Sequence, residues 1–132
     1  MSRQLKFIDL FAGIGGFHLA LKSIGMKCVF TSEIDKYARQ TYAANFKDKY
    51  LKDPNLFTGD IWKVDYKNIP NFDILCGGFP CQPFSQAGYK RGFKDNKDGN
   101  LFFAILEILK KKKPTVFFLE NVRHLKNHDS GK

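Results

Sequence analysis

A cysteine stands between two prolines directly after an apolar run of the sequence. The run covers Phe72–Cys76, a pair of glycines follows it, and Cys81 lies between Pro80 and Pro83. This pattern predicts a buried strand that ends in a tight turn, and the prolines exclude helix and sheet pairing beside the cysteine. A thiol held in such a loop faces a cleft, where its thiolate can act as a nucleophile. The alternative is that Cys81 is one more small buried residue.

A carboxylate follows the last apolar run. Thr115–Leu119 predicts a buried strand, and Glu120 comes directly after it. A carboxylate at the end of a continuous apolar strand is costly unless it is paired or used in chemistry. Because ligands bind at the carboxyl ends of the strands in an open parallel sheet, we expect Cys81 and Glu120 to lie at the same edge.

A glycine-rich turn and an acid follow the first two predicted strands. Leu5–Leu10 predicts the first strand, and residues 11–16, Phe-Ala-Gly-Ile-Gly-Gly, predict a turn whose backbone can approach a ligand closely. Glu33, at the end of a second strand that opens at Cys28, can accept both hydroxyls of a ribose. The alternatives are a tight turn without a ligand and a surface carboxylate. A nicotinamide or flavin site is disfavoured, since its fingerprint needs glycine where the chain has His18.

Apolar residues at helical spacing predict helices after the first, second and fourth strands. The second of them, Asp35–Asn45, contains nothing that suggests chemistry, and Pro114 ends the third, Leu101–Leu109. Lys47–Asn55 predicts a polar surface loop, and Leu56–Ile61 predicts a brief third strand and turn. The residues expected to share one apolar face are Phe17, Ala20, Leu21 and Ile24 in the first helix, Ala38, Thr41, Tyr42 and Asn45 in the second, and Phe102, Ile105, Leu106 and Leu109 in the third.

The order of these elements predicts the fold class. Five strands that alternate with helices favour an α/β fold with a doubly wound, mainly parallel sheet. The glycine-punctuated, basic segment Gln86–Asn100 follows Cys81 and is interpreted as a lid over the site, with a solvated loop as the alternative.

Size and charge restrict the partners. The 132 residues suit about one domain, and 22 Lys and Arg against 13 Asp and Glu give a net charge of +9, which favours a polyanionic partner without separating DNA from RNA. No signal peptide and no bilayer-spanning run are expected, so the predicted location is the cytosol. The three cysteines fit reduced thiols. The spacing of Cys76 and Cys81 is not that of a zinc site, so no metal is expected.

Residues 78–85, Gly-Phe-Pro-Cys-Gln-Pro-Phe-Ser, resemble the catalytic loop of the cytosine-5 DNA methyltransferases. Residues 9–16, Asp-Leu-Phe-Ala-Gly-Ile-Gly-Gly, resemble the S-adenosylmethionine loop of the same family, and Glu-Asn-Val at 120–122 matches a third motif. The resemblance covers about Phe7 to Asn127. It implies a Rossmann-like sheet of the S-adenosylmethionine-dependent methyltransferase type, acting on cytosine in double-stranded DNA, typical of a bacterial restriction-modification system with a cytoplasmic, nucleoid-associated location.

The resemblance also implies roles for particular residues. Cys81 would be the nucleophile, and Glu120 would contact the flipped cytosine. Candidates for contact with the nucleic acid are Gln82, Ser85, Lys90 and Arg91. The implied S-adenosylmethionine contacts are Phe11, Gly13, Ile14, Gly15, Gly16, Glu33, Ile34, Asp60, Ile61, Pro80 and Leu101.

The chain departs from the family in length. It contains no Gln-x-Arg-x-Arg segment, no target-recognition domain and no C-terminal segment that completes the cofactor pocket. Residues 1–132 are therefore expected to form a partial S-adenosylmethionine-binding catalytic domain, with the sheet incomplete at its C-terminal side. The open alternatives are a split enzyme completed by a second polypeptide, a truncated inactive relic, a non-catalytic nucleic-acid or cofactor-binding module, and an enzyme that methylates cytosine in tRNA.

Overall fold

The computed structural model describes residues 3–79 and 101–120 and contains a five-stranded parallel sheet. The strand order is β3-β2-β1-β4-β5, and the fold class predicted from the sequence is confirmed. The strands are β1 (Lys6–Leu10), β2 (Lys27–Ser32), β3 (Phe57–Thr58), β4 (Ile74–Gly77) and β5 (Val116–Leu119). The helices are α1 (Gly16–Ser23), α2 (Lys36–Asn45) and α4 (Leu101–Lys112), with short 3-10 helices η1 (Lys49–Lys52), η2 (Ile61–Lys63) and η3 (Tyr66–Asn68).

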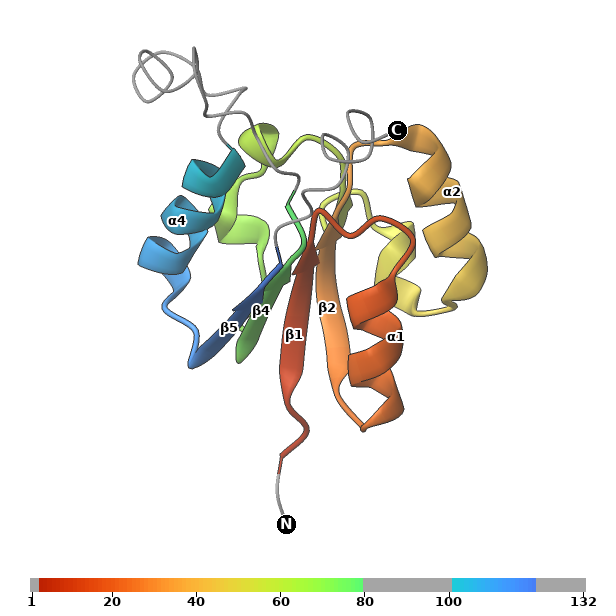
Figure 1. Ribbon diagram of the computed structural model, residues 1–132, viewed down its shortest axis with the longest axis horizontal. Coiled ribbons are helices and arrows are strands. Elements are labelled where there is room, and N and C mark those ends of the chain that lie inside the picture. Colours follow the sequence, from red (N-terminus) through yellow and green to blue (C-terminus); the bar gives the residue numbers. More distant parts are fainter. Residues whose placement is uncertain (1–2, 80–100, 121–132) are drawn as a thin grey trace, which may run out of the picture.

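Helices cover both faces of the sheet. Figure 1 shows α1 and α2 on one side and α4 on the other, with the carboxyl ends of the strands at the top. Alternate residues of β1 serve the two layers, because side chains along a strand point to opposite faces. Ile8 belongs to the buried cluster that contains Ile105 of α4, whereas Phe7 belongs to the cluster packed by Leu21 of α1. Strands buried on both faces read as apolar runs, which is why the sequence revealed them.

Local signals set the helix boundaries. The Asp35 side chain accepts hydrogen bonds from the backbone N–H of Tyr37 (2.8 Å) and Ala38 (3.4 Å) and so caps α2. Gly25 follows α1 with a φ of 94°, and Pro114 follows the last turn of α4, both as expected.

The predicted apolar faces of the helices were wrong in part. Thr41 and Asn45 of α2 are exposed, and Tyr42 is its one buried residue. In α1 the buried residue is His18, while Ala20 is exposed and Ile24, which directly follows the helix, is 71% exposed. The cause is that short helices touch the sheet along a narrow line, so a broad apolar stripe predicts more burial than occurs. In α4 the buried residues are Ala104, Ile105 and Ile108, with Phe102, Leu106 and Leu109 half-buried.

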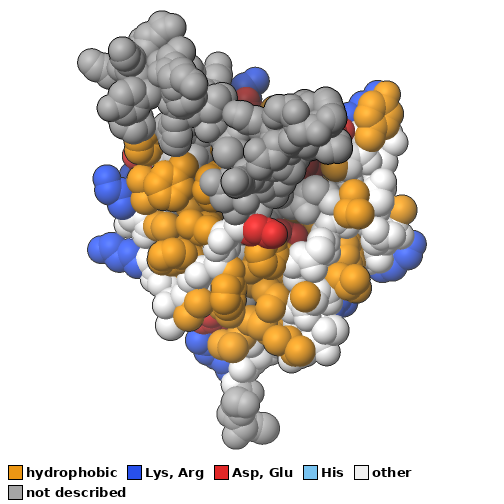
Figure 2. Space-filling model, viewed as in Figure 1, with side chains coloured by type: hydrophobic (Ala, Val, Ile, Leu, Met, Phe, Trp, Pro, Cys, Tyr) orange, Lys and Arg blue, Asp and Glu red, His pale blue; other side chains and the backbone are white. Residues whose placement is uncertain are grey.

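The expectation that Thr115–Leu119 is buried was also wrong. Val116, Phe117 and Phe118 are 39%, 53% and 49% exposed. In the described part of the chain, β5 pairs with β4 alone and forms the edge of the sheet, and of its residues Leu119 packs against the core cluster. Figure 2 shows hydrophobic side chains gathered down the middle of the viewed face. This exposed edge agrees with a sheet that is incomplete at its C-terminal side.

Within residues 3–79 and 101–120, no helix has the length and apolar character that crossing a bilayer requires. The same ranges contain no cluster of three or more His, Cys, Asp or Glu side chains that could hold a metal ion.

Candidate active site

The glycine-rich turn lies directly above the end of β1. Gly13 and Gly15 have φ angles of 59° and 103°, and Phe11 also adopts a positive φ of 54°. The backbone N–H of Ala12 donates to the carbonyl of Ser32 at 3.1 Å, and that of Gly15 donates to the carbonyl of Ala12 at 3.0 Å. The turn is therefore held between the ends of β1 and β2, the place expected for a ligand site.

Glu33 joins the end of β2 to this turn. Its Oε1 accepts a hydrogen bond from the backbone N–H of Gly13 at 2.7 Å, and its Oε2 accepts one from the backbone N–H of Asp35 at 2.8 Å. The carboxylate is half-buried. Glu33 thus lies against the glycine turn, at the carboxyl end of β2 where the sequence predicted it.

The segment after β3 reaches the same edge of the sheet. The Ser32 hydroxyl donates to the carbonyl of Gly59 at 3.0 Å, which places Asp60 beside the end of β2. Asp60 caps η2 by accepting from the backbone N–H of Trp62 at 2.9 Å. Ile61 is 4% exposed and belongs to the core, so little of its side chain faces outward.

The apolar residues proposed for the cofactor fall into two groups. Ile14 and Ile34 are 60% and 69% exposed and can cover a flat apolar ligand. Phe11 and Leu101 are half-buried and pack against the core cluster on the α4 side. Gly16 begins α1 and is exposed. The turn, Glu33 and Asp60 therefore come together as expected, with the two isoleucines on the outside.

Glu120 lies next to the strand that leads to Cys81. Its backbone N–H donates to the carbonyl of Gly77 at 2.8 Å, and the backbone N–H of Gly78 donates to the carbonyl of Leu10 at 3.3 Å. The chain thus leaves β4 between Glu120 and the end of β1, which carries the glycine turn. Six predicted site residues lie outside the described ranges, namely Pro80, Cys81, Gln82, Ser85, Lys90 and Arg91.

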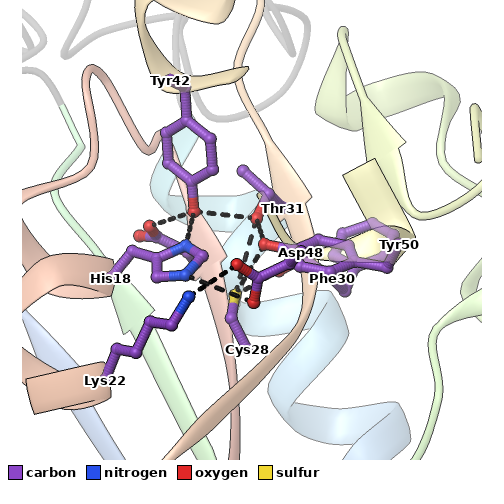
Figure 3. Close-up of polar contacts among 9 residues, drawn as sticks. His18, Lys22, Cys28, Phe30, Thr31, Tyr42, Asp48 and Tyr50 are labelled. Atoms are coloured by element: carbon purple, nitrogen blue, oxygen red, sulfur yellow. Dashed lines mark hydrogen bonds and ion pairs between the residues drawn. The ribbon is translucent and has the colours of Figure 1, made fainter. Parts of the chain in front are cut away.

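A buried polar cluster supports the turn from below, between the sheet and the helices α1 and α2 (Figure 3). The hydroxyl of Tyr42 donates to Asp9 Oδ2 at 2.9 Å and lies 2.7 Å from His18 Nδ1 and 3.0 Å from the hydroxyl of Thr31. The hydroxyl of Tyr50 contacts Thr31 at 2.7 Å. Lys47–Asn55 is therefore not only a surface loop, because Tyr50 extends from it into the core.

Comparison with known proteins decides the family. The model of the C-5 cytosine-specific DNA methylases matches residues 5–132. The chain belongs to this family.

Curated relatives of this methylase chain share about half of its residues. It is 53% identical over 127 residues to the type II methyltransferase M.HhaI of Haemophilus parahaemolyticus, covering 96% of this chain and 36% of that protein. It is 56% identical over 130 residues to M1.ScrFI of Lactococcus lactis subsp. cremoris, covering 98% of this chain and 31% of that protein. The chain thus spans about a third of the length of these relatives.

A solved structure agrees with the family assignment. A crystal structure described as a DNA modification methyltransferase encoded within a prophage of E. coli superposes with a TM-score of 0.63 at 26% identity. The match covers 96% of this chain and 35% of that one. The family's fold is therefore present in the described part of the chain.

Two of the cysteines in this methylase chain are inert. Burial raises the pKa of the Cys28 thiol to about 11 and that of the Cys76 thiol to about 12. Both are buried and free of disulfide bonds. A neutral, buried thiol is a poor nucleophile, so neither cysteine can perform the chemistry expected of Cys81.

Burial also shifts the pKa values of two ionisable groups beneath the turn, and in both cases it favours the neutral form. It raises the pKa of Asp9 to about 7, helped by the negative charge of Glu33 and opposed by the Tyr42 hydrogen bond. It lowers the pKa of His18 to about 4, opposed by Asp48. The sequence motifs do not indicate the pairing of His18 with Tyr42, although a histidine at a helix start and an aromatic pair, Tyr42 and Phe46, four residues apart are visible in the sequence.

These shifts predict opposite pH dependences of stability. Asp9 keeps a proton in the folded state that it loses in the unfolded state between about pH 4 and 7, so its contribution to stability falls as the pH rises through that window. His18 gains a proton only on unfolding between about pH 4 and 6.5, so its contribution falls as the pH drops. In the native protein the two slopes nearly cancel.

Single substitutions should separate the two slopes. In Asp9→Asn only the histidine remains, and we expect the free energy of unfolding to decrease below pH 6.5 by up to about 1.4 kcal/mol per pH unit relative to wild type. In His18→Leu we expect it to increase by a similar amount per unit on acidification. Denaturant unfolding between pH 4.5 and 7.5 measures both slopes. Equal slopes in the two variants would contradict the assignment.

Proposed function

We propose that the chain is the catalytic part of a DNA (cytosine-5-)-methyltransferase that transfers a methyl group from S-adenosylmethionine to carbon-5 of cytosine in DNA. The observation that carries the proposal is the convergence of three chain segments at one edge of the sheet. The hydrogen bond from Glu120 to Gly77 and that from Gly78 to Leu10 bring the glutamate, the strand leading to Cys81 and the glycine turn together. Membership of the family supports the same reaction.

The residues at this edge suit S-adenosylmethionine. The glycine turn provides close backbone approach, and Glu33 lies where it can accept the ribose hydroxyls. Ile14 and Ile34 offer exposed apolar surface for the adenine, and Asp60 can accept from its amino group. The remaining proposed contacts are Phe11, Gly16, Ile61, Pro80 and Leu101. When bound, the cofactor supplies an electrophilic methyl group on a sulfonium.

Cys81 would activate the cytosine by covalent addition. Carbon-5 of cytosine is a poor nucleophile, so the thiolate first adds to carbon-6. The electrons of the carbon-5–carbon-6 double bond then shift within the ring, and carbon-5 becomes nucleophilic enough to take the methyl group. Once carbon-5 carries the methyl group, its proton leaves to a base and the sulfur is expelled, which restores the double bond. A thiolate suits both steps because it is a strong nucleophile and a workable leaving group.

Glu120 would hold the cytosine during this addition. Its carboxyl group can hydrogen-bond the ring nitrogen and the exocyclic amine, and these contacts stabilise the charge that develops as sulfur adds. Glu120 is exposed at the end of β5, so a base can reach it. Because carbon-6 is shielded in a duplex, the base must be flipped out of the helix.

The proposal also covers the residues that contact the nucleic acid, the biological role and a partner polypeptide. Gln82, Ser85, Lys90 and Arg91 would contact the strand, helped by the net charge of +9. A role in restriction and modification in the bacterial cytoplasm is proposed because the named relatives are type II methyltransferases. A second polypeptide with the target-recognition segments would complete the enzyme if the protein is split.

Trapping with 5-fluorocytosine tests the reaction. Fluorine at carbon-5 cannot leave as a proton does, so the sulfur–carbon bond persists and a denaturation-resistant adduct accumulates. The protein is mixed with S-adenosylmethionine and a pool of duplexes whose fluorinated cytosine has varied neighbours, alone and with a candidate second polypeptide. An adduct on duplex DNA supports the proposal. An adduct on 5-fluorocytidine tRNA alone would show that the substrate is tRNA and not DNA. No adduct under any condition would refute methyl transfer.

A further inference from the structure

One buried hydroxyl joins three elements beneath the cofactor turn. Tyr42 of α2 contacts Asp9 in β1, His18 in α1 and Thr31 in β2, at 2.9, 2.7 and 3.0 Å (Figure 3). The side chains of Tyr42, His18 and Thr31 have no measurable exposure, and Asp9 is 1% exposed. The Tyr42 hydroxyl donates to Asp9, and its oxygen lies within hydrogen-bond distance of His18 Nδ1 and of the Thr31 hydroxyl, so one hydroxyl links three elements.

The three partners bracket the binding segments. Asp9 stands two residues before Phe11, where the turn begins, and His18 stands three residues after Gly15, where it ends. Thr31 stands two residues before Glu33. One hydroxyl therefore fixes both ends of the glycine turn and the strand end that carries the proposed ribose ligand.

The rings of Tyr42 in α2 and of Phe46, which directly follows α2, also form the floor of the turn. A Cβ placed on Gly15 would lie 2.3 Å from Phe46 Cε2 and 3.2 Å from Tyr42 Cε2. The Phe46 ring in turn stacks on the His18 ring, with centroids 3.8 Å apart and planes at 8°. The backbone of the turn thus rests directly on two aromatic rings that other buried side chains hold in place.

The composition of this cluster points to more than a stabilising core. Among the described residues, Asp9 Oδ1 and His18 Nε2 are buried without a hydrogen-bond partner, and Nε2 lies 3.7 Å from Asp48 Oδ2. Each such group costs folding free energy, and apolar residues of similar size would pack here without that cost. The polar cluster instead specifies geometry, because hydrogen bonds fix the relative positions of β1, α1 and β2 more sharply than apolar contacts do.

We propose that Tyr42 is a positioning residue that holds the glycine turn and Glu33 in their binding arrangement before S-adenosylmethionine arrives. The identity of the ligand rests on the proposed function, whereas the ordering of the glycine turn by Tyr42 can be tested without any ligand. A turn that is already ordered loses less conformational entropy on binding, so the residue acts on cofactor affinity and not on the chemical step.

The test compares Tyr42→Phe with the matched variant Tyr50→Phe. Each removes one hydroxyl that contacts Thr31. The Tyr50 hydroxyl, however, donates to Cys28 at 3.0 Å, and its ring, which the variant keeps, lies 6.5 Å from the His18 ring between centroids. The first readout is the exchange protection of the backbone N–H of Gly13, measured by NMR without cofactor. The second is the dissociation constant for S-adenosylmethionine by calorimetry, together with kcat and KM for the protein in its active assembly.

We expect Tyr42→Phe to reduce Gly13 protection and to weaken cofactor binding about tenfold, raising KM with kcat nearly unchanged, and Tyr50→Phe to leave all four at wild-type values. Equal effects of the two variants, or no effect of Tyr42→Phe on Gly13 protection, would overturn the inference. If the wild type itself fails to bind S-adenosylmethionine, the proposed function fails while the exchange comparison still judges the positioning role. Should Tyr42→Phe unfold, His18→Leu removes the contact between His18 and the Tyr42 hydroxyl. That variant must then reproduce the reduced Gly13 protection and the weaker cofactor binding.

Discussion

We expect the replacement of Cys81 with alanine to abolish the adduct with 5-fluorocytosine DNA and to lower methyl transfer by at least about a thousand-fold, because the nucleophile is removed. The reason is chemical: without the sulfur, carbon-6 has no partner and carbon-5 stays unreactive. Binding of S-adenosylmethionine should persist, because the turn and Glu33 are unchanged. Denaturing gels, transfer of a labelled methyl group and calorimetry measure the three quantities.

Cys76→Ala provides the matched control. Cys76 is fully buried in β4, beside Asp9 of β1 in the sheet register, and its thiol has a pKa of about 12. We expect this variant to keep the adduct and to lose stability through the small cavity, by about 1 kcal/mol. The reverse pattern, an adduct that survives Cys81→Ala and disappears in Cys76→Ala, would move the nucleophile to another residue.

The sequence predicted the parts of the fold that local patterns determine. The strand, glycine turn and helix at the start of the chain follow from an apolar run, three glycines within residues 13–16 and Gly25 at the helix end. The position of Glu33 was predictable for the same reason, since the end of a strand fixes the edge at which the next residue emerges. These features depend on neighbours in the sequence.

Burial that depends on distant elements was not predictable in this way. Phe117 and Phe118 form an apolar run that is typical of a central strand, but β5 has a described neighbour on one side only. Whether such residues are buried depends on elements that pack against the strand, and these cannot be read from the apolar run itself. The relatives' chains are about three times as long, and this difference in length agrees with an uncovered edge.

The polar cluster was missed for a related reason. Tyr42 was expected on the apolar face of a helix without chemistry, and its partners stand 33 positions away at Asp9 and 24 at His18. A buried polar residue is recognisable only when its partner is known, because an unpaired one would be excluded from a core. The cluster therefore became visible with the tertiary structure.

The second large effect is expected for Gly15→Ala. Gly15 has a φ of 103°, which costs an L side chain about 1 to 3 kcal/mol, and its Cβ would lie 2.3 Å from Phe46 Cε2. The ring cannot move away easily, because it is 7% exposed and stacked on His18. Overpacking adds a similar cost, so we expect a total loss of about 4 kcal/mol in the free energy of unfolding, with loss of cofactor binding.

Gly13→Ala separates crowding from backbone strain. Gly13 also has a positive φ, 59°, but no atom lies within 4 Å of a Cβ built there, so only strain of about 1 kcal/mol is expected. Denaturant unfolding of both variants measures the difference. The double variant Gly15→Ala, Phe46→Leu should recover part of the loss, because a smaller side chain relieves the contact and the two changes are then not additive. Equal losses at the two glycines, or strict additivity with Phe46→Leu, would mean that the ring does not support the turn.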